Sequence, residues 1–142
     1  MSNREQKIFS ARLVMLPDTA DFTQDFCDRH DISHDDAMRL RLIIEELFTN
    51  TVQHGYRGES DAPISVTLHL DAGAVTVLYE DSAPRYDPLA HTSGPGPDAS
   101  RSGVSRPVGG LGVYLVSKLV ERPSYAYEDG FNRLRLTLLF AP

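Results

Sequence analysis

The pattern of hydrophobic and polar positions divides the first third of the chain into a strand and two helices. Residues 7–16 are rich in strand-forming side chains and stop at Pro17, which predicts a first strand. Residues 18–30 place apolar side chains mainly three and four positions apart, as the buried side of a helix does. A stronger helical pattern follows, so the sequence predicts one strand and then two consecutive helices.

This stronger pattern covers residues 34–55. Ser33 and Asp36 resemble a capping box at its start, and Gly55 is typical of the position where a helix ends. At 100° per residue the apolar side chains fall on one side, whereas Glu46 and Asn50 fall on the opposite side. The sequence therefore predicts an amphipathic helix whose polar side faces away from the core.

Two hairpins and a long loop complete the pattern. The predicted strands of the hairpins cover residues 64–70, 74–80, 123–128 and 132–140. Between the hairpins, residues 81–110 are rich in Gly and Pro, and a short helix from Gly112 to about Glu121 follows. A loop of this length is usually functional or disordered. The order of elements predicts an α+β fold, a two-layer α/β sandwich with helices on one face of a mostly antiparallel sheet.

The composition is that of one ordinary globular domain. The chain has 142 residues, of which 41% are hydrophobic and 24% charged, enough to bury a core without disulfides or a structural metal. Its 14 Lys and Arg against 20 Asp and Glu give a formal charge of −6. Because binding to a phosphate backbone depends on clustered Lys and Arg, we expect no direct contact with nucleic acid.

Cys27 is the single cysteine of the chain and cannot form an intrachain disulfide. This is typical of a protein of the reducing cytosol. The polar N-terminus lacks the pattern of a signal peptide, and no apolar run approaches the ~18 residues that a membrane span needs. We therefore expect a cytoplasmic protein without a membrane anchor.

Glu46 and Asn50 are about one helical turn apart and so lie side by side on the predicted helix. A carboxamide oxygen is a hard ligand suited to Mg²⁺, and a neighbouring carboxylate can accept a proton from a nucleophile that attacks a phosphate. Taken alone, however, such a pair is more often part of a solvated helix face.

Asp81 ends the second strand of the first hairpin and begins a turn that contains Pro84. A carboxylate fixed at this point can accept a hydrogen bond from an exocyclic amine such as that of adenine. The structural alternative is an Asx turn that caps the loop. The spacing alone does not decide between these two roles.

Gly109, Gly110 and Gly112 come at the start of the short helix, where free backbone N–H groups and the positive end of the helix dipole favour an anion. The Lys and Ser/Thr of a Walker loop are missing, as is the dinucleotide-binding glycine pattern with its βαβ frame. The five histidines are scattered, and neither paired Cys/His spacing nor a G-x-S-x-G motif occurs. Zinc sites and nucleophilic hydrolases are therefore disfavoured.

The order of these motifs is more specific than any one of them. Glu46-Leu-Phe-Thr-Asn50 runs into His54-Gly-Tyr56, the first hairpin ends in Glu80-Asp-Ser-Ala-Pro-Arg-Tyr-Asp-Pro-Leu89, and Gly109-Gly-Leu-Gly-Val-Tyr-Leu-Val116 follows the loop. This order resembles the ATP-binding domain shared by DNA gyrase, the heat-shock chaperone ATPases, histidine kinases and mismatch-repair ATPases. Over nearly its whole length the chain looks most like the stand-alone anti-sigma-factor serine/threonine kinases of bacteria.

The resemblance implies a Bergerat-type ATP-binding fold that occupies residues 1–142 as one domain, with a long flexible lid over about 89–110. It implies ATP and Mg²⁺ as cofactors, with Asn50 as the Mg²⁺ ligand and Glu46 as the base that activates the acceptor hydroxyl. Asp81 would bind the amino group of adenine. The further nucleotide-binding residues that it implies are Ala83, Gly109, Gly110, Leu111 and Gly112.

One of these residues departs from the family pattern. The family's first glycine box is usually Asp-x-Gly, and Ala83 stands here in place of that Gly. The extra methyl group narrows the room beside the base, so we expect nucleotide affinity to be the property that this change affects. We also expect residues 90–108 of the lid to be mobile without nucleotide.

By this resemblance the chain is an ATP-dependent serine/threonine kinase and an anti-sigma factor in a partner-switching system. It would phosphorylate an anti-sigma-factor antagonist and sequester a sigma factor, and family members often form homodimers. Two alternatives stay open, a nucleotide-gated protein-binding module with little or no kinase activity and a detached catalytic domain of a sensor histidine kinase. Neither nucleic acid nor a membrane is expected as a direct partner.

Overall fold

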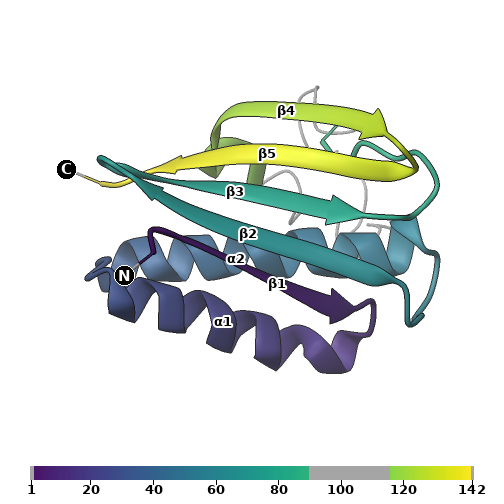
Figure 1. The fold of residues 1–142 in the computed structure, drawn as a ribbon, viewed down its shortest axis with the longest axis horizontal. Coiled ribbons are helices and arrows are strands. Elements are labelled where there is room, and N and C mark those ends of the chain that lie inside the picture. Colours follow the sequence, from purple (N-terminus) through teal and green to yellow (C-terminus); the bar gives the residue numbers. More distant parts are fainter. Residues whose placement is uncertain (1, 90–115, 142) are drawn as a thin grey trace, which may run out of the picture.

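Two helices cover one face of a five-stranded antiparallel sheet in the computed structural model of the chain, which describes residues 2–89 and 116–141 (Figure 1). The strand order is β1-β2-β3-β5-β4, and every neighbouring pair is antiparallel. The strands are Arg4–Ser10 (β1), Pro63–Asp71 (β2), Ala74–Asp81 (β3), Glu121–Glu128 (β4) and Phe131–Leu139 (β5). The helices α1 and α2 cover Leu16–Arg29 and His34–Asn50. This architecture confirms the predicted α+β sandwich.

The first strand begins and ends earlier than the sequence predicts. β1 stops at Ser10, a 3₁₀ turn covers Leu13–Met15, and α1 begins at Leu16. The expectation of a strand as far as residue 16 is therefore wrong. Pro17 lies in the first turn of α1, where the fixed φ of proline and its missing N–H suit a helix, so this proline begins a helix instead of only ending a strand.

α2 confirms the predicted amphipathic helix, with a change in its last turn. Ser33 caps the helix as predicted by accepting a hydrogen bond from the Asp36 N–H at 3.1 Å. The Asp36 carboxylate accepts from the Ser33 hydroxyl, so the reciprocal bond from the Ser33 N–H that completes a capping box is not among the hydrogen bonds of the described residues. After α2 the chain continues as a π-helical turn, η2 (Thr51–Gly55), in which the Tyr56 N–H donates to the Thr51 carbonyl at 2.8 Å. Single π turns occur frequently at functional sites, and this one begins directly after Asn50, the last residue of α2.

Both hairpins form close to their predicted bounds. Gly73 and Gly130 occupy their turns with φ of +77° and +82°, a conformation that favours glycine. The short helix before β4 ends sooner than the sequence predicts, because residues 116–119 are helical and Glu121 already belongs to β4. The predicted start of this helix lies outside the described residues.

The hydrophobic core fills the space between the two helices and the sheet. Phe9 of β1 meets Phe48 of α2 edge-on, with ring centroids 6.3 Å apart, and both side chains are buried. Leucine and isoleucine side chains of α2 and alternate residues of β2, β3 and β5 surround this pair. Burial of this apolar area is the main stabilising contribution, and it fixes α2 against the sheet.

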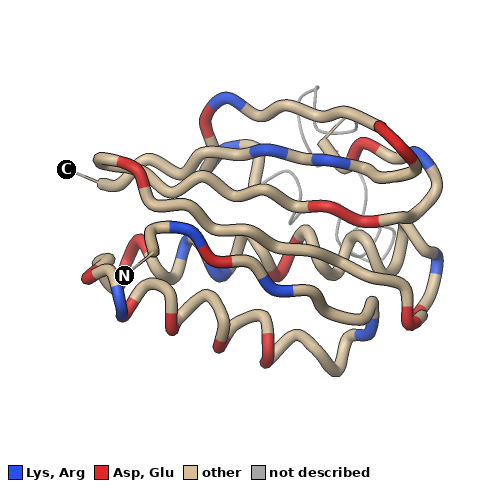
Figure 2. The backbone as a smooth tube through the Cα atoms, in the orientation of Figure 1, with Lys and Arg blue, Asp and Glu red and all other residues tan. Residues whose placement is uncertain are grey.

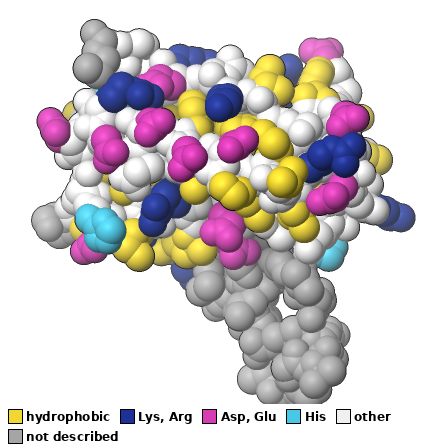
Figure 3. All heavy atoms as spheres, turned by 90° about the horizontal axis from the view of Figure 1, so that it is seen from below, with side chains coloured by type: hydrophobic (Ala, Val, Ile, Leu, Met, Phe, Trp, Pro, Cys, Tyr) yellow, Lys and Arg dark blue, Asp and Glu magenta, His cyan; other side chains and the backbone are white. Residues whose placement is uncertain are grey.

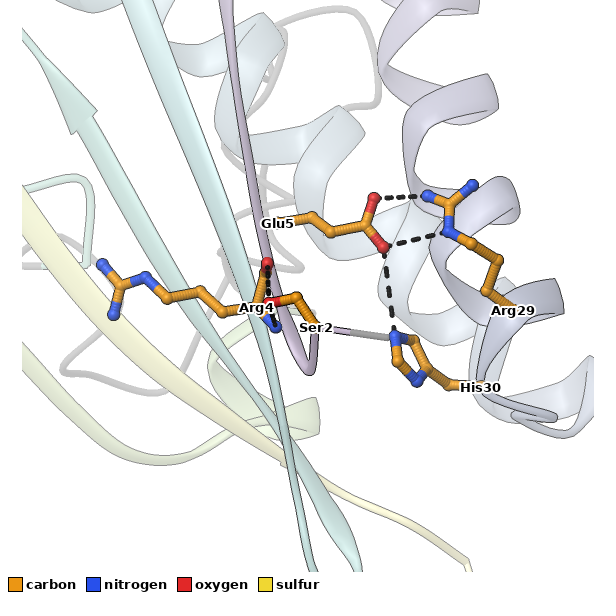
Figure 4. A network of polar contacts seen from close by, with 5 residues as sticks. All are labelled: Ser2, Arg4, Glu5, Arg29 and His30. Atoms are coloured by element: carbon orange, nitrogen blue, oxygen red, sulfur yellow. Dashed lines mark hydrogen bonds and ion pairs between the residues drawn. The ribbon is translucent and has the colours of Figure 1, made fainter.

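A polar cluster joins the edge strand β1 to the end of α1 (Figure 4). Glu5 accepts hydrogen bonds from Arg29, one from Nε at 3.0 Å and one from a terminal nitrogen. Nε2 of His30, the residue after α1, lies 3.9 Å from the same carboxylate, and its ring is 4.5 Å from that of Phe26. Exposed ion pairs contribute little to stability, so the cluster chiefly sets the position of β1 on the helix.

The last residues of the chain are held by the start of α2. Asp36 is buried in the first turn of the helix. Its carboxylate accepts hydrogen bonds from Ser33 Oγ at 2.9 Å, from Arg39, and from the backbone N–H of Ala141 at 3.3 Å. Burial acts to raise the pKa of Asp36, but these donors outweigh it and hold the pKa below its ordinary value. Asp36 therefore joins the helix cap to the segment after β5.

We expect Asp36→Asn to lower the free energy of unfolding by about 1–3 kcal/mol at neutral pH, because the amide nitrogen cannot accept the bonds that the carboxylate oxygen accepts. A carboxyl whose pKa is lowered by folding stabilises the fold above its unfolded pKa of about 4, and this contribution is lost as the pH falls through the folded pKa. The difference between the two proteins should therefore shrink below about pH 4 in urea unfolding experiments. Asp35→Asn, at an exposed position in the same turn, is the matched control. Equal unfolding energies for the two variants would contradict the role given to Asp36.

Candidate functional site

The candidate site lies where the end of β3, the turn η2 and β5 meet. Asp81 is the last residue of β3, and the sheet register places it between Ile64 of β2 and Asn132 of β5. It is buried, with 7% of its surface exposed. An ionised carboxylate is stable in such a place only where hydrogen-bond donors surround it, so the partners of Asp81 define the site.

Three donors from three parts of the chain surround the Asp81 carboxylate. Oδ1 accepts hydrogen bonds from Asn132 Nδ2 at 2.9 Å and from the Ala83 N–H at 3.1 Å. Oδ2 accepts one from the Thr51 hydroxyl at 3.2 Å, and no other described residue donates to it. Burial raises the pKa of Asp81 above its ordinary value, while the three hydrogen bonds act in the opposite direction. Oδ2 can therefore accept a further bond, for example from an amino group of a ligand.

Thr51 connects this carboxylate to the core. Its hydroxyl donates to Asp81 and accepts a hydrogen bond from the Tyr79 hydroxyl at 2.7 Å. Tyr79 is buried two residues before Asp81 on β3, and its hydroxyl also lies 3.1 Å from the carbonyl of Leu47 in α2. The Thr51 hydroxyl proton points towards the carboxylate, which favours its ionised form, and the single Tyr79 proton has two acceptors within reach, the Thr51 oxygen and the Leu47 carbonyl.

Asn132 organises the segment that follows β3. Besides its bond to the carboxylate, its Nδ2 lies 3.0 Å from the Ala83 carbonyl and 3.2 Å from the Pro84 carbonyl. Its Oδ1 accepts hydrogen bonds from the Tyr86 N–H at 2.9 Å and from the Tyr125 hydroxyl at 2.5 Å. This single side chain of β5 therefore holds both the end of β3 and the residues after it.

Glu46 and Asn50 lie on α2, directly before η2. Glu46 is half-buried and makes no hydrogen bond or ion pair with another described residue. Burial raises the pKa of Glu46, helped by the charge of Glu45, and so brings it nearer the range of a general base. Asn50 is 3% exposed, and its Nδ2 has no partner among the described residues. The predicted polar side of the helix is therefore buried at Asn50, with an unsatisfied group that a ligand could bind.

Ala83 packs against the end of the helical segment. It is 1% exposed, and a methyl group placed on Gly55 would lie 3.4 Å from its Cβ and 3.5 Å from Thr51 Cγ2. These are ordinary van der Waals distances, so position 55 has room for a methyl group in contact with Ala83 and Thr51. The expected effect of Ala83 on nucleotide affinity stays a prediction.

The remaining predicted site residues lie outside the described part of the chain. They are Gly109, Gly110, Leu111 and Gly112. The expected lid over about 89–110 and its expected mobility without nucleotide fall on the same part, apart from Leu89.

Two residues of the site, Thr51 and Asn132, were not predicted as functional. Thr51 falls on the apolar side of the helical projection, and Asn132 occupies a core-facing position of a strand with alternating burial. The signal that could have identified both is a polar residue at a core-facing position, because buried polar groups need hydrogen-bond partners.

The described residues offer no metal site built from protein side chains alone. Over residues 2–89 and 116–141, no three His, Cys, Asp or Glu side chains gather closely enough to hold a metal ion. Mg²⁺ at phosphate-transferring sites usually takes one or two protein ligands, and phosphate oxygens and waters complete its shell. The carboxamide of Asn50 is buried, and its oxygen is an atom that suits a shell of this kind. Its nitrogen, which has no partner among the described residues, is a donor and suits a phosphate oxygen instead.

Charge is unevenly distributed over the described surface. Basic residues lie along β5, and acidic residues lie along α1 and at the end of β3 (Figure 2). Asp18, Asp21, Asp25 and Asp28 are exposed at helical spacing on α1, and Figure 3 shows acidic side chains in a row over the helical face. A face of this charge repels a phosphate backbone. No described helix is long and apolar enough to span a membrane.

Several known proteins are similar to this chain in sequence. The chain is 32% identical over 103 residues to the serine/threonine-protein kinase BtrW of Bordetella bronchiseptica, which covers 72% of this chain and 70% of that protein. It is 26% identical over 105 residues to the serine-protein kinase RsbW of Listeria innocua, a match that covers 73% of this chain and 67% of that protein. It is 27% identical over 99 residues to the serine-protein kinase RsbW of Bacillus licheniformis, a match that covers 69% of this chain and 62% of that protein.

The family model described as histidine kinase-like ATPase domain matches residues 9–138. The match runs from Phe9, near the end of β1, to Leu138, one residue before the end of β5, and includes every element that builds the candidate site. Together with the relatives, it confirms the resemblance drawn from the order of the motifs. The chain belongs to the histidine kinase-like ATPase domain family.

Proposed function

We propose that the chain is an ATP-dependent protein serine/threonine kinase that acts as an anti-sigma factor in a partner-switching system. The observation that carries the proposal is the buried carboxylate of Asp81, held as an acceptor beside the helix that bears Glu46 and Asn50. The family and the similarity to proteins named serine-protein kinase support the type of reaction. The proposal treats residues 1–142 as one ATP-binding unit that works in the cytoplasm.

Asp81 would accept a hydrogen bond from the amino group of adenine. Its partners in the described structure are all donors, and Oδ2 has room for one more. A base with a keto oxygen at the same position would place an acceptor against an acceptor, which leaves buried polar groups unpaired. The site therefore favours adenine over guanine.

Asn50 would bind Mg²⁺ through its carboxamide oxygen, together with the phosphates of ATP. The burial of this carboxamide on the helix that leads to the Asp81 site supports this role. Its nitrogen, without a partner among the described residues, would donate to a phosphate oxygen. A chain with a net charge of −6 needs such local neutralisation to bind a polyanion. The backbone N–H groups proposed to face the phosphates belong to Gly109, Gly110, Leu111 and Gly112.

Glu46 would act as the general base. In the reaction, the serine oxygen of the substrate protein forms a bond to the γ-phosphorus of ATP, and the bond from that phosphorus to the bridging oxygen breaks. ADP leaves, and the serine proton passes to the Glu46 carboxylate. The raised pKa of Glu46 supports this role, because a base with a pKa nearer neutrality accepts a proton more readily.

The proposed substrate is an anti-sigma-factor antagonist, with a sigma factor as the second partner and a homodimer as the assembly. These partners are taken from the family resemblance. The alternatives, a nucleotide-gated binding module and a histidine kinase catalytic domain, differ from the proposal in where the phosphate goes. A transfer assay therefore separates them.

Glu46→Gln should abolish phosphoryl transfer while ATP still binds. We expect labelling of an antagonist protein by labelled ATP and Mg²⁺ to slow about 10²–10⁴-fold, which is the usual contribution of a general base. The affinity for ATP in isothermal titration calorimetry should stay within about twofold. Glu45→Gln is the matched control, since this neighbouring carboxylate is exposed and is changed in the same way.

The chemical form of the label decides between the alternatives. Acid-stable phosphoserine or phosphothreonine supports the proposal, and an acid-labile phosphohistidine would favour a histidine kinase domain. ATP binding without any label would favour the nucleotide-gated module. Equal transfer by the unaltered chain and by Glu46→Gln would contradict the role of Glu46.

Asn50→Ala should weaken ATP binding only in the presence of Mg²⁺. We expect the affinity for ATP to fall at least about tenfold with Mg²⁺ and to change little with EDTA. The variant loses the proposed metal ligand but keeps Asp81, the proposed contact for adenine. Thr49→Ala, one residue earlier on α2, is the control. A loss of the same size under both conditions would rule out Asn50 as a metal ligand.

A further inference from the structure

We infer that Asn132 is a positioning residue for nucleotide recognition: it holds Asp81 as an ionised acceptor and so gives the site its preference for an amino group over a keto oxygen. This inference rests on the proposed function. It assigns the specificity of the site to a side chain that acts through Asp81 and need not touch the nucleotide.

The orientation of the Asn132 carboxamide is fixed by partners of known polarity. The backbone N–H of Tyr86 can only donate, so the atom that faces it at 2.9 Å is the carboxamide oxygen. The carbonyls of Ala83 and Pro84 can only accept, so the atom that faces them at 3.0 and 3.2 Å is the nitrogen. A flipped amide would place its nitrogen, a donor, against the Tyr86 N–H and its oxygen, an acceptor, against the two carbonyls. Asn132 therefore presents a donor to Asp81.

This donor favours the ionised form of Asp81. Asp81 and Asn132 are 7% and 5% exposed, so water competes poorly for the contact between them. Burial alone would favour the neutral acid, whose O–H would present a donor to the ligand. The Asn132 N–H, 2.9 Å from Oδ1, opposes this protonation. The ionised carboxylate presents acceptors only, and so matches an amino group.

The contact is set by the sheet. Asn132 and Asp81 are direct partners in the register of β3 and β5. The same carboxamide also binds the backbone of Ala83, Pro84 and Tyr86, the segment that follows β3. A change at Asn132 therefore alters the carboxylate and the backbone beside it together.

Asn132→Asp tests the inference because it keeps the shape of the side chain and removes the donor. Two carboxylates would then face each other, and the pair would retain one proton at a pH well above the ordinary carboxyl pKa. With that proton the pair keeps a donor between its oxygens, and without it the two groups repel. We expect the affinity for ATP, relative to that of the unaltered chain, to rise at least about fivefold as the pH falls from about 8 to about 6.

Other titrating groups do not account for such a change. Those that face Asp81 in the described part of the chain are the phenols of Tyr56, Tyr79 and Tyr125, and burial raises the pKa of each above its ordinary value. All three stay neutral at neutral pH. Tyr125→Phe is the matched control, because it removes a donor to the Asn132 oxygen and leaves the contact with Asp81 in place. Its affinity relative to the unaltered chain should not depend on pH.

Asn132→Ala provides a second readout if Asn132→Asp does not fold. We expect its affinity for ATP to fall about tenfold while its affinity for GTP changes little, because the lost donor alters recognition of the base and not of the phosphates. A merely structural role would lower both affinities by the same factor. That result, or a pH-independent relative affinity of Asn132→Asp, would overturn the inference although the unaltered chain binds ATP. Failure of the unaltered chain to bind ATP would overturn the proposed function as well.

Discussion

A buried carboxylate with its donors is the interaction on which the site depends. Asp81 can stay ionised away from water only because Thr51, Asn132 and the Ala83 N–H donate to it. Thr51 and Asn132 lie 30 and 51 residues away along the chain. The donors come together only when the helical layer and the sheet have both formed, so the site is a product of the whole fold.

The helical layer connects this carboxylate to the residues proposed for phosphate chemistry. Packing of Phe48 on Phe9 fixes α2 against the sheet, and the π turn after α2 brings Thr51 to the end of β3. Glu46 and Asn50 precede that turn on the same helix. One helical segment therefore bears Thr51, which holds Asp81, and the two residues proposed for phosphate chemistry.

Local sequence patterns predicted the elements well and their long-range contacts poorly. The helical spacing of apolar residues in α2 and the alternation of apolar and polar residues in both hairpins follow from burial of one face of each element. Such patterns are visible in a single sequence. Pro17 was ambiguous because proline both ends strands and begins helices. The roles of Thr51 and Asn132 depend on the π turn and on the β3–β5 register, which bring together residues that are distant in the sequence. Asp81 was predicted from its place at a strand end, but not the donors that surround it.

The central claim is that Asp81 accepts a hydrogen bond from the amino group of adenine. A comparison of two nucleotides tests this claim most directly. Inosine triphosphate carries a keto oxygen where ATP carries this amino group and otherwise presents the same sugar and phosphates. Isothermal titration calorimetry of the unaltered chain with each nucleotide and Mg²⁺ measures how strongly the site prefers the adenine edge, an amino group beside an unprotonated N1, to the hypoxanthine edge, a keto oxygen beside an N1–H. A hydrogen bond to a charged group contributes about 1.5–3 kcal/mol, so ATP should bind at least about tenfold more tightly. Equal affinity for the two nucleotides, or tighter binding of inosine triphosphate, would contradict the account.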